Sequence, residues 1–215
     1  MTTKNPVFEK TYKDYIAQVA GINFESIAQK LGVHAEGNDV TIPLFGKPHK
    51  VSETGITDPS GNQPSLGICV ICCKYLLMCP DIYPIEKEWV SFRGLKDSGP
   101  LTVYFANDVE RAISGYFAGR LNDMKEACKR LGGYSPGMEV NYDLSMQFDA
   151  LPEVPVILFF NDADEEFPAK SSVLFEKRSE DYLDPECLAM VGRLLFTYLK
   201  KAVNNKEGLP YVAIK

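Results

Sequence analysis

The sequence predicts an α+β fold in which helices pack on a mixed, mostly antiparallel sheet around one layered core. Two kinds of periodicity support this. Some segments repeat apolar residues every three or four positions, as amphipathic helices do, and others alternate in twos, as half-buried strands do. Helical and strand segments come in runs and do not alternate regularly, which disfavours a βαβ winding. The 215 residues, 45% of them hydrophobic and 24% charged, are typical of a globular chain. We expect a single domain over residues 1–215, with helices and a meander in 1–64 and the helical and sheet core in 65–215.

Helices are expected wherever the three- and four-residue repeat persists. Gly21 and Gly32 end the first two, because glycine readily adopts the left-handed conformation that closes a helix. The last helix opens with Asp184, a capping residue, followed by Pro185 and an acid in the first turn. The expected helices cover residues 8–19, 24–31, 65–79, 109–131 with a break near Gly119, and 185–199.

Strands are expected where the period changes to two. Residues 33–53 alternate and contain turn-forming Gly, Asn and Pro, which predicts a small antiparallel meander. Residues 89–92 and 145–150 indicate short strands. The continuous apolar run 154–160 predicts a central strand covered on both faces. Residues 54–64 have the composition of an exposed, mobile loop.

Charge and hydropathy disfavour several classes of protein. The net charge of −6, without a basic stripe interleaved with aromatic residues, argues against nucleic-acid binding. The amino-terminal residues mix charges of both signs, unlike a secretion signal, so we expect a cytoplasmic protein. The longest apolar run, residues 66–78, contains Lys74 and is too short to span a membrane. Neither the oligomeric state nor a cofactor follows from these features.

Four of the six cysteines fall close together, at Cys69, Cys72, Cys73 and Cys79. Four thiolates could hold zinc or an iron–sulfur cluster. However, the surrounding apolar residues have a helical pattern, and free cysteine is among the most buried residue types, so the pattern favours core thiols. The two histidines, His34 and His49, cannot alone form a three-ligand catalytic metal site, and we interpret them as polar packing residues.

An acidic segment directly follows the apolar strand. Its carboxylates are hard oxygen ligands of the kind that magnesium and calcium prefer, which makes Asp162 and Asp164 candidate metal ligands. The alternative is structural: the aspartates turn the chain, and the acids favour the amino end of a helix that starts near Pro168.

An arginine beside aromatic residues offers a second candidate site. Arg93 follows Trp89 at the end of a short predicted strand and could clamp a carboxylate or a phosphate. It could also simply form an ion pair with the acidic segment. The candidate ligand-binding residues are therefore Trp89, Arg93, Asp164, Glu165, Glu166 and Phe167.

Three stretches of the chain resemble the bacterial and archaeal family known as domain of unknown function 3786. They are WVSFRGL at 89–95, ACKRLGG at 127–133, and FDALPEVPVILFFNDADEEFPAKSSVLFEKRSEDYL at 148–183, in which SVLF is expected to be helical. The resemblance lends no activity. It does imply a setting of metallocofactor or one-carbon chemistry in anaerobic microbes, because some relatives are fused to small iron–sulfur modules. Family members have aliphatic residues where this chain has Cys69, Cys72 and Cys73, so the resemblance does not support a shared thiolate site.

The leading hypothesis is a cytoplasmic accessory protein that binds a small ligand or metallocofactor, such as a tetrapyrrole or an iron–sulfur group, or that meets a partner metalloprotein. One alternative is a divalent-metal-dependent enzyme that uses the carboxylates of residues 162–166 to activate water. The other is a protein–protein interaction module.

Overall fold

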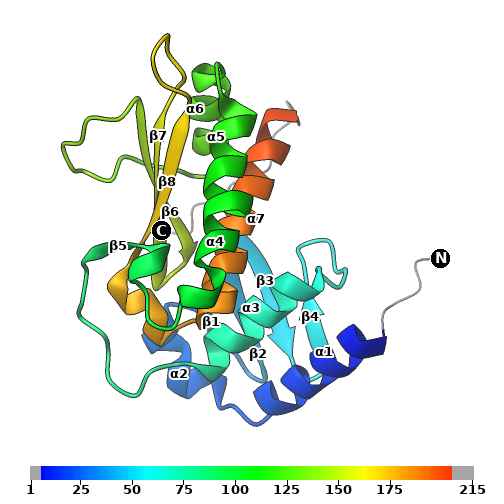
Figure 1. The fold of residues 1–215 in the computed structure, drawn as a ribbon. Coiled ribbons are helices and arrows are strands. Elements are labelled where there is room, and N and C mark those ends of the chain that lie inside the picture. Colours follow the sequence, from blue (N-terminus) through cyan, green and yellow to red (C-terminus); the bar gives the residue numbers. More distant parts are fainter. Residues whose placement is uncertain (1–5, 205–215) are drawn as a thin grey trace.

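The computed structural model describes residues 6–204, which form two four-stranded antiparallel sheets with helices around them (Figure 1). The first sheet has the order β1-β2-β3-β4 and is a simple meander. Its strands are β1 (His34–Glu36), β2 (Asp39–Leu44), β3 (Lys47–Ser52) and β4 (Gly55–Thr57). The helices of this part are α1 (Pro6–Val19), α2 (Phe24–Leu31) and α3 (Leu66–Leu77).

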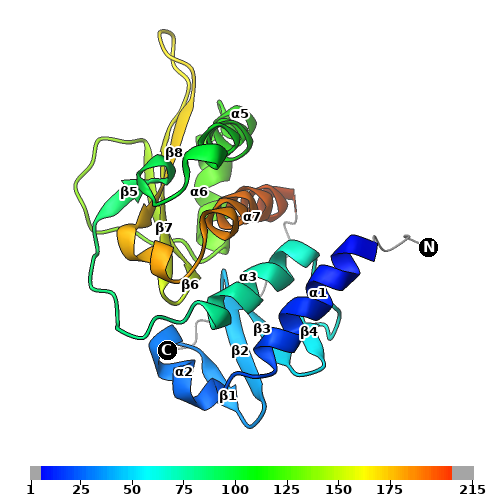
Figure 2. The same ribbon diagram turned by 60° about the horizontal axis from the view of Figure 1, so that its bottom comes forward.

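The second sheet has the order β5-β8-β7-β6. Its strands are β5 (Trp89–Ser91), β6 (Leu144–Leu151), β7 (Val154–Asn161) and β8 (Lys170–Glu176). The helical segments that accompany it are η1 (Phe92–Gly94), η2 (Gly99–Leu101), α4 (Thr102–Phe105), the π-helical η3 (Ala106–Arg111), α5 (Ala112–Phe117), α6 (Leu121–Arg130), η4 (Lys177–Asp181) and α7 (Pro185–Asn204). In Figure 2 the β7–β8 hairpin projects well beyond the body of the molecule.

Helix α7 runs between the two sheets and packs against helices of both parts, α3 on one side and α6 and η3 on the other (Figure 1). Asp184 caps its first turn as expected, because the Cys187 N–H donates to Asp184 Oδ1 at 2.9 Å. Gly192 allows the close approach of α4, since a Cβ at this position would lie 2.6 Å from the Phe105 ring. The buried apolar residues of both sheets and of these helices form one continuous core.

The α+β class and most of the expected helices and strands are confirmed. The strands are divided between two sheets, and every pairing among residues 6–204 is antiparallel. Strand β7 is an interior strand, buried on both faces as its sequence predicts. The break in the long helical segment falls at residues 118–120, which include Gly119 as predicted.

Two local predictions are wrong. The SVLF segment and the residues after Pro168 form strand β8 and not a helix: Ser171, Val173 and Phe175 are buried while their neighbours are more exposed, which is the two-residue alternation of a strand. Residues 54–64 are not entirely loop, because Gly55–Thr57 pairs with β3 as β4. Within the described part of the chain, no helix is long and apolar enough to cross a membrane.

Candidate functional site

A cavity of about 800 Å³ lies at the base of the loop, residues 162–169, that joins β7 to β8. We call it the hairpin cleft. Three parts of the chain enclose it: the η3–α5 helix, the loop before β6, and the hairpin itself. Its ionisable and aromatic lining residues are Glu110, Arg111, Tyr142, Asp143, Asp162, Asp164, Phe167 and Lys170.

The helical wall of the cleft contains the π-helical turn η3, a rare conformation that occurs often at functional sites. Glu110 of this turn holds the edge of β8 with two groups. Its backbone carbonyl accepts a hydrogen bond of 2.6 Å from Ser171 Oγ, and its carboxylate Oε1 accepts one of 3.0 Å from the Val173 N–H. Strand β5 pairs only with residues 174–176 of β8. At Val173 the Glu110 carboxylate therefore accepts the backbone hydrogen bond that a neighbouring strand would otherwise accept.

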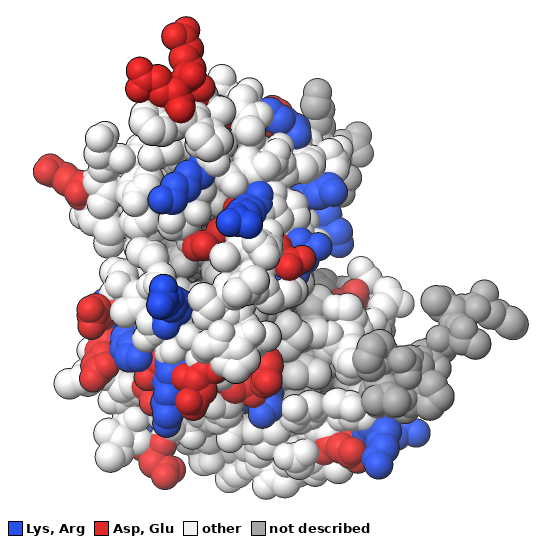
Figure 3. All heavy atoms as spheres, viewed as in Figure 1, with Lys and Arg blue, Asp and Glu red and all other residues white. Residues whose placement is uncertain are grey.

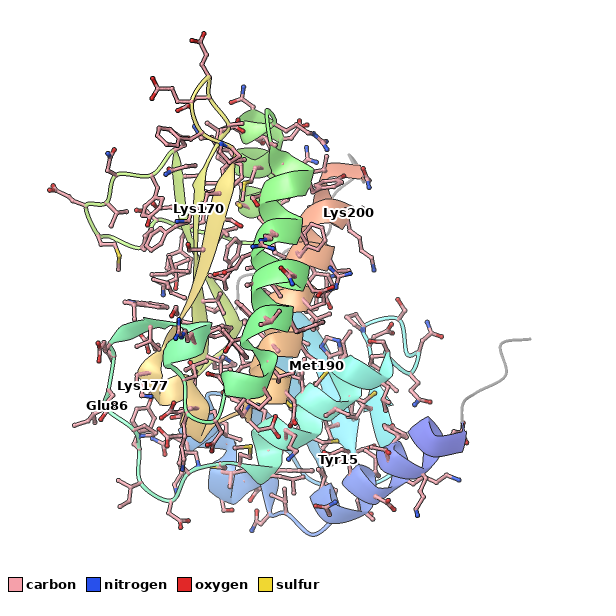
Figure 4. The ribbon with its side chains drawn as sticks, in the orientation of Figure 1. Tyr15, Glu86, Lys170, Lys177, Met190 and Lys200 are labelled. Atoms are coloured by element: carbon pink, nitrogen blue, oxygen red, sulfur yellow. The ribbon has the colours of Figure 1, made fainter. Side chains whose placement is uncertain are left out.

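The surroundings of Glu110 also perturb its ionisation. Burial raises the pKa of its carboxyl above the ordinary value, and the hydrogen bond from Val173 N–H and the positive charge of Lys170 offset part of that rise. Lys170 stands at the start of β8, directly after the hairpin loop, and is labelled in Figure 4. Carboxyls with raised pKa values in cavities are frequent in functional sites.

The hairpin loop, residues 162–169, is organised by aspartates that accept hydrogen bonds from backbone amides. Asp162 Oδ1 accepts from the N–H groups of Gly119 at 2.6 Å and Ala163 at 2.8 Å. Asp164 Oδ1 accepts from Glu166 at 2.8 Å and Phe167 at 2.7 Å. Asp143 Oδ2 accepts from the Asp162 N–H at 2.7 Å. Each of these bonds uses one oxygen of a carboxylate, and the second oxygen accepts no hydrogen bond within residues 6–204.

Aromatic rings add flat surface to the cleft. Tyr142 stacks on Phe159 of β7, with ring centroids 4.5 Å apart and nearly parallel planes, and its ring is 42% exposed. Phe167 of the hairpin loop is 66% exposed. The cleft therefore combines stacking surface with charges of both signs.

The structure brings only some of the predicted site residues together. Asp162, Asp164 and Phe167 line the hairpin cleft, whereas Glu165 and Glu166 are exposed in the same loop but do not line it. Trp89 and Arg93 lie elsewhere, because Trp89 pairs with Glu176 and Ser91 with Leu174, toward the other end of β8 from the hairpin loop. The four residue-to-residue steps from Lys170 to Leu174 alone span about 13 Å.

The cysteines of α3 lie in the core. Cys69, Cys72 and Cys73 are at most 1% exposed, and Cys79 lies beyond the end of the helix. Burial raises the pKa of Cys69 to about 11 and that of Cys73 to about 12, which disfavours thiolates at neutral pH. Among residues 6–204, no three His, Cys, Asp or Glu side chains are grouped so that they could hold a metal ion.

The two histidines occupy different environments in the first sheet. His34 is exposed on β1, whereas His49 is 2% exposed on β3 and its Nδ1 lies 2.8 Å from the Lys47 carbonyl oxygen. Burial lowers the pKa of His49, so its neutral form is favoured. Neither histidine lines the hairpin cleft.

A second polar cluster, which we call the Arg178 network, lies where η4 follows β8. Arg178, 8% exposed, donates from Nε to Glu176 Oε2 at 2.5 Å and from its terminal nitrogen to Glu153 Oε2. The Tyr83 hydroxyl donates to the same Glu153 oxygen at 2.6 Å. These residues come from three distant parts of the sequence, so no local pattern indicates the network.

A further cavity of about 740 Å³ lies between α1 and the segments on either side of β4. The Tyr12 hydroxyl at its wall accepts a hydrogen bond of 2.8 Å from the Ile56 N–H. This cavity is lined mainly by apolar surface, whereas the hairpin cleft combines Glu110 with Lys170 and three aspartates. The hairpin cleft is therefore the stronger candidate site.

Comparison with known proteins places the chain in a family. Residues 23–198 match the family model described as domain of unknown function DUF3786. The chain belongs to this family. The match confirms the resemblance carried by the three sequence stretches and extends it to α2 and the first sheet. No curated protein and no solved structure matches the chain.

Proposed function

We propose that this DUF3786 protein is an accessory protein that binds a small polar molecule in the hairpin cleft. The volume of about 800 Å³ is within the usual range for sites that bind small molecules. The observation that carries the proposal is the pairing of a half-buried carboxyl, Glu110, with a lysine, Lys170, in the same cavity. On the sequence grounds given above, we expect the protein to act in the cytoplasm.

The distribution of charge supports a ligand that carries both a positive and a negative group. Asp143, Asp162 and Asp164 each keep a carboxylate oxygen that is not used by a backbone amide, and these oxygens suit an amine or a guanidine. Lys170 and Arg111 supply donors for a carboxylate or a phosphate. The face of Tyr142 can stack against a planar or apolar part of the same molecule.

Thermal unfolding in the presence of small-molecule classes tests this proposal. A zwitterionic amino acid or dipeptide is expected to raise the Tm of the protein, because a ligand that binds only the folded state stabilises it by mass action. A diamine and a dicarboxylate are expected to have smaller effects. Lys170→Ala should reduce the stabilisation, while the exposed Lys96→Ala, outside the cleft, should keep it.

The proposal fails if no class of zwitterion shifts the Tm, or if Lys96→Ala reduces the shift as much as Lys170→Ala does. A diamine that stabilises the protein as strongly as the zwitterions would show that Lys170 and Arg111 do not bind an acidic group of the ligand.

A metallocofactor, as the family resemblance implies, is a more specific form of the same proposal. Within the described residues the cleft offers single carboxylates and not a set of three metal ligands, so it supports an organic ligand better than a bound cluster. The same point bears on the metal-dependent enzyme, which would need a third ligand beside Asp162 and Asp164. An absorbance spectrum of anaerobically purified protein tests for a tetrapyrrole or an iron–sulfur group.

A further inference from the structure

A row of cations lies on aromatic rings beside the hairpin, on the outer faces of α5 and α7. Lys200 Nζ lies 5.3 Å and the Arg120 guanidinium 4.9 Å from the centroid of the Tyr116 ring. Arg193 lies 5.2 Å from the centroid of Phe196, and the rings of Tyr116 and Phe196 meet edge to face at 6.1 Å. We call these five side chains the cationic ridge.

The cationic ridge is suited to bind an acidic surface. The ring faces hold the cations in place, so less side-chain entropy is lost when a carboxylate binds. From residue 187 to residue 204, α7 contains no acid. Arg120 already forms an ion pair of 3.0 Å with Asp123, but neither Arg193 nor Lys200 forms one within residues 6–204. Figure 3 shows Lys and Arg side chains gathered over these helices.

The tip of the β7–β8 hairpin has the complementary character. Glu165 and Glu166 are exposed and form no ion pair in the described part of the chain, and Phe167 beside them is 66% exposed. In Figure 3 acidic side chains stand together at this projecting tip. Within residues 6–204, no other segment covers the two glutamates and the Phe167 ring.

The tip and the ridge are adjacent on the surface. Gly119, which donates to Asp162 at the base of the hairpin loop, directly precedes Arg120 of the ridge. A surface with an acidic half beside a basic half is complementary to itself when it is turned by a two-fold axis. Each copy then places its tip on the ridge of the other.

We propose that two copies of this chain form a two-fold dimer in which the hairpin tip of each lies on the cationic ridge of the other. Glu165 and Glu166 pair with Arg193 and Lys200, and Phe167 packs beside Phe196. The contact is electrostatic, so it weakens as salt screens the charges. It goes beyond the ligand proposal, because neither the two glutamates nor the cations of α7 line the hairpin cleft.

Sedimentation equilibrium of the full chain with charge reversals tests the dimer. The wild type is expected to show a mass above 24.0 kDa that rises with protein concentration. This association should be strong at about 0.02 M salt and weak at about 0.5 M, where the screening length is only a few ångströms. The tip variant Glu165→Lys/Glu166→Lys and the ridge variant Arg193→Glu/Lys200→Glu should each raise the dissociation constant at least about tenfold, because like charges then meet.

Mixing the two variants in equal amounts provides the decisive result. The reversed tip of one variant then faces the reversed ridge of the other, and the two unreversed elements also match, so a heterodimer should form with near wild-type affinity. The control Asp14→Lys/Glu36→Lys makes the same charge change at exposed positions of α1 and β1 and should leave association unchanged.

Several results would overturn the proposal. A wild type that stays monomeric at low salt rules out the dimer. Association that survives both reversals, or a mixture that fails to associate, rules out the tip-on-ridge contact. Circular dichroism of each variant confirms that it is folded. The Tm shift that zwitterions cause in each variant is measured as well, so that failure of the dimer proposal can be told apart from failure of the cleft proposal.

Discussion

The Arg178 network and the hairpin cleft both contain several charged residues, but they use them differently. In the network Arg178 bonds two carboxylates and Tyr83 bonds one of them, so the charges are nearly all matched by partners from the same chain. In the cleft Lys170 forms no ion pair with residues 6–204, and each aspartate has one oxygen that accepts no hydrogen bond from them. Charge density alone therefore does not mark a site. Charged groups beside a cavity that still have unused hydrogen-bonding capacity are the better indication of one.

The largest expected effect comes from breaking the Arg178 network. Arg178→Ala should lower the free energy of unfolding by about 3–5 kcal/mol, because Glu153 and Glu176 would remain nearly buried without their cation. Arg111→Ala, which removes an exposed arginine at the cleft, should cost no more than about 0.5 kcal/mol. Urea unfolding monitored by circular dichroism measures both. Equal losses in the two variants would contradict the distinction between a structural network and an open site.

An intermediate effect is expected at the base of the hairpin loop. Asp162→Ala removes the acceptor of the Gly119 and Ala163 amides and should cost about 1 kcal/mol. Hydrogen exchange at the Gly119 amide should become faster in this variant. Glu165→Ala, at the exposed tip, serves as the control and should leave both the stability and the exchange rate unchanged.

The smallest effect concerns the pH dependence of stability. Because burial raises the pKa of Glu110 in the folded state, the unfolded chain releases this proton first as pH rises above the ordinary value of 4.5. Ionisation of Glu110 therefore costs stability at higher pH. Glu110→Gln keeps an oxygen that can accept from Val173 and removes this cost.

The stability difference between Glu110→Gln and the wild type should therefore grow in favour of the variant as pH rises from 4.5, and then become constant. Thermal unfolding at a series of pH values measures it. A difference that is independent of pH would show that Glu110 is not perturbed, and would weaken its assignment to the cleft.

The sequence predicts much of the fold because its periodicities are local. The apolar run of β7 and the capping residues of α7 each lie within a few positions, so they can be recognised without tertiary information. The helix predicted for the SVLF segment is wrong because a short apolar run does not distinguish a helix from a strand. The deciding interactions are its pairings with β7 and β5, which are distant in sequence.

One signal of the π-helical turn was present in the sequence. Val109, Ile113 and Phe117 recur at two successive four-residue steps, each of which is more than the 3.6 residues of an α-helical turn. A π-helical turn absorbs such an excess. The position of Glu110 against β8, however, joins residues about sixty positions apart, and the cationic ridge joins two helices. No linear pattern contains either one.

Native mass spectrometry of gently purified protein tests the central claim, that the hairpin cleft holds a small molecule, most directly. The wild type should carry a low-mass adduct, and Ala106→Trp, which fills the helical wall of the cleft, should lack it while remaining folded. Tandem dissociation should release an ion with both basic and acidic groups. A wild type of bare chain mass, or the same adduct on both proteins, would contradict the account.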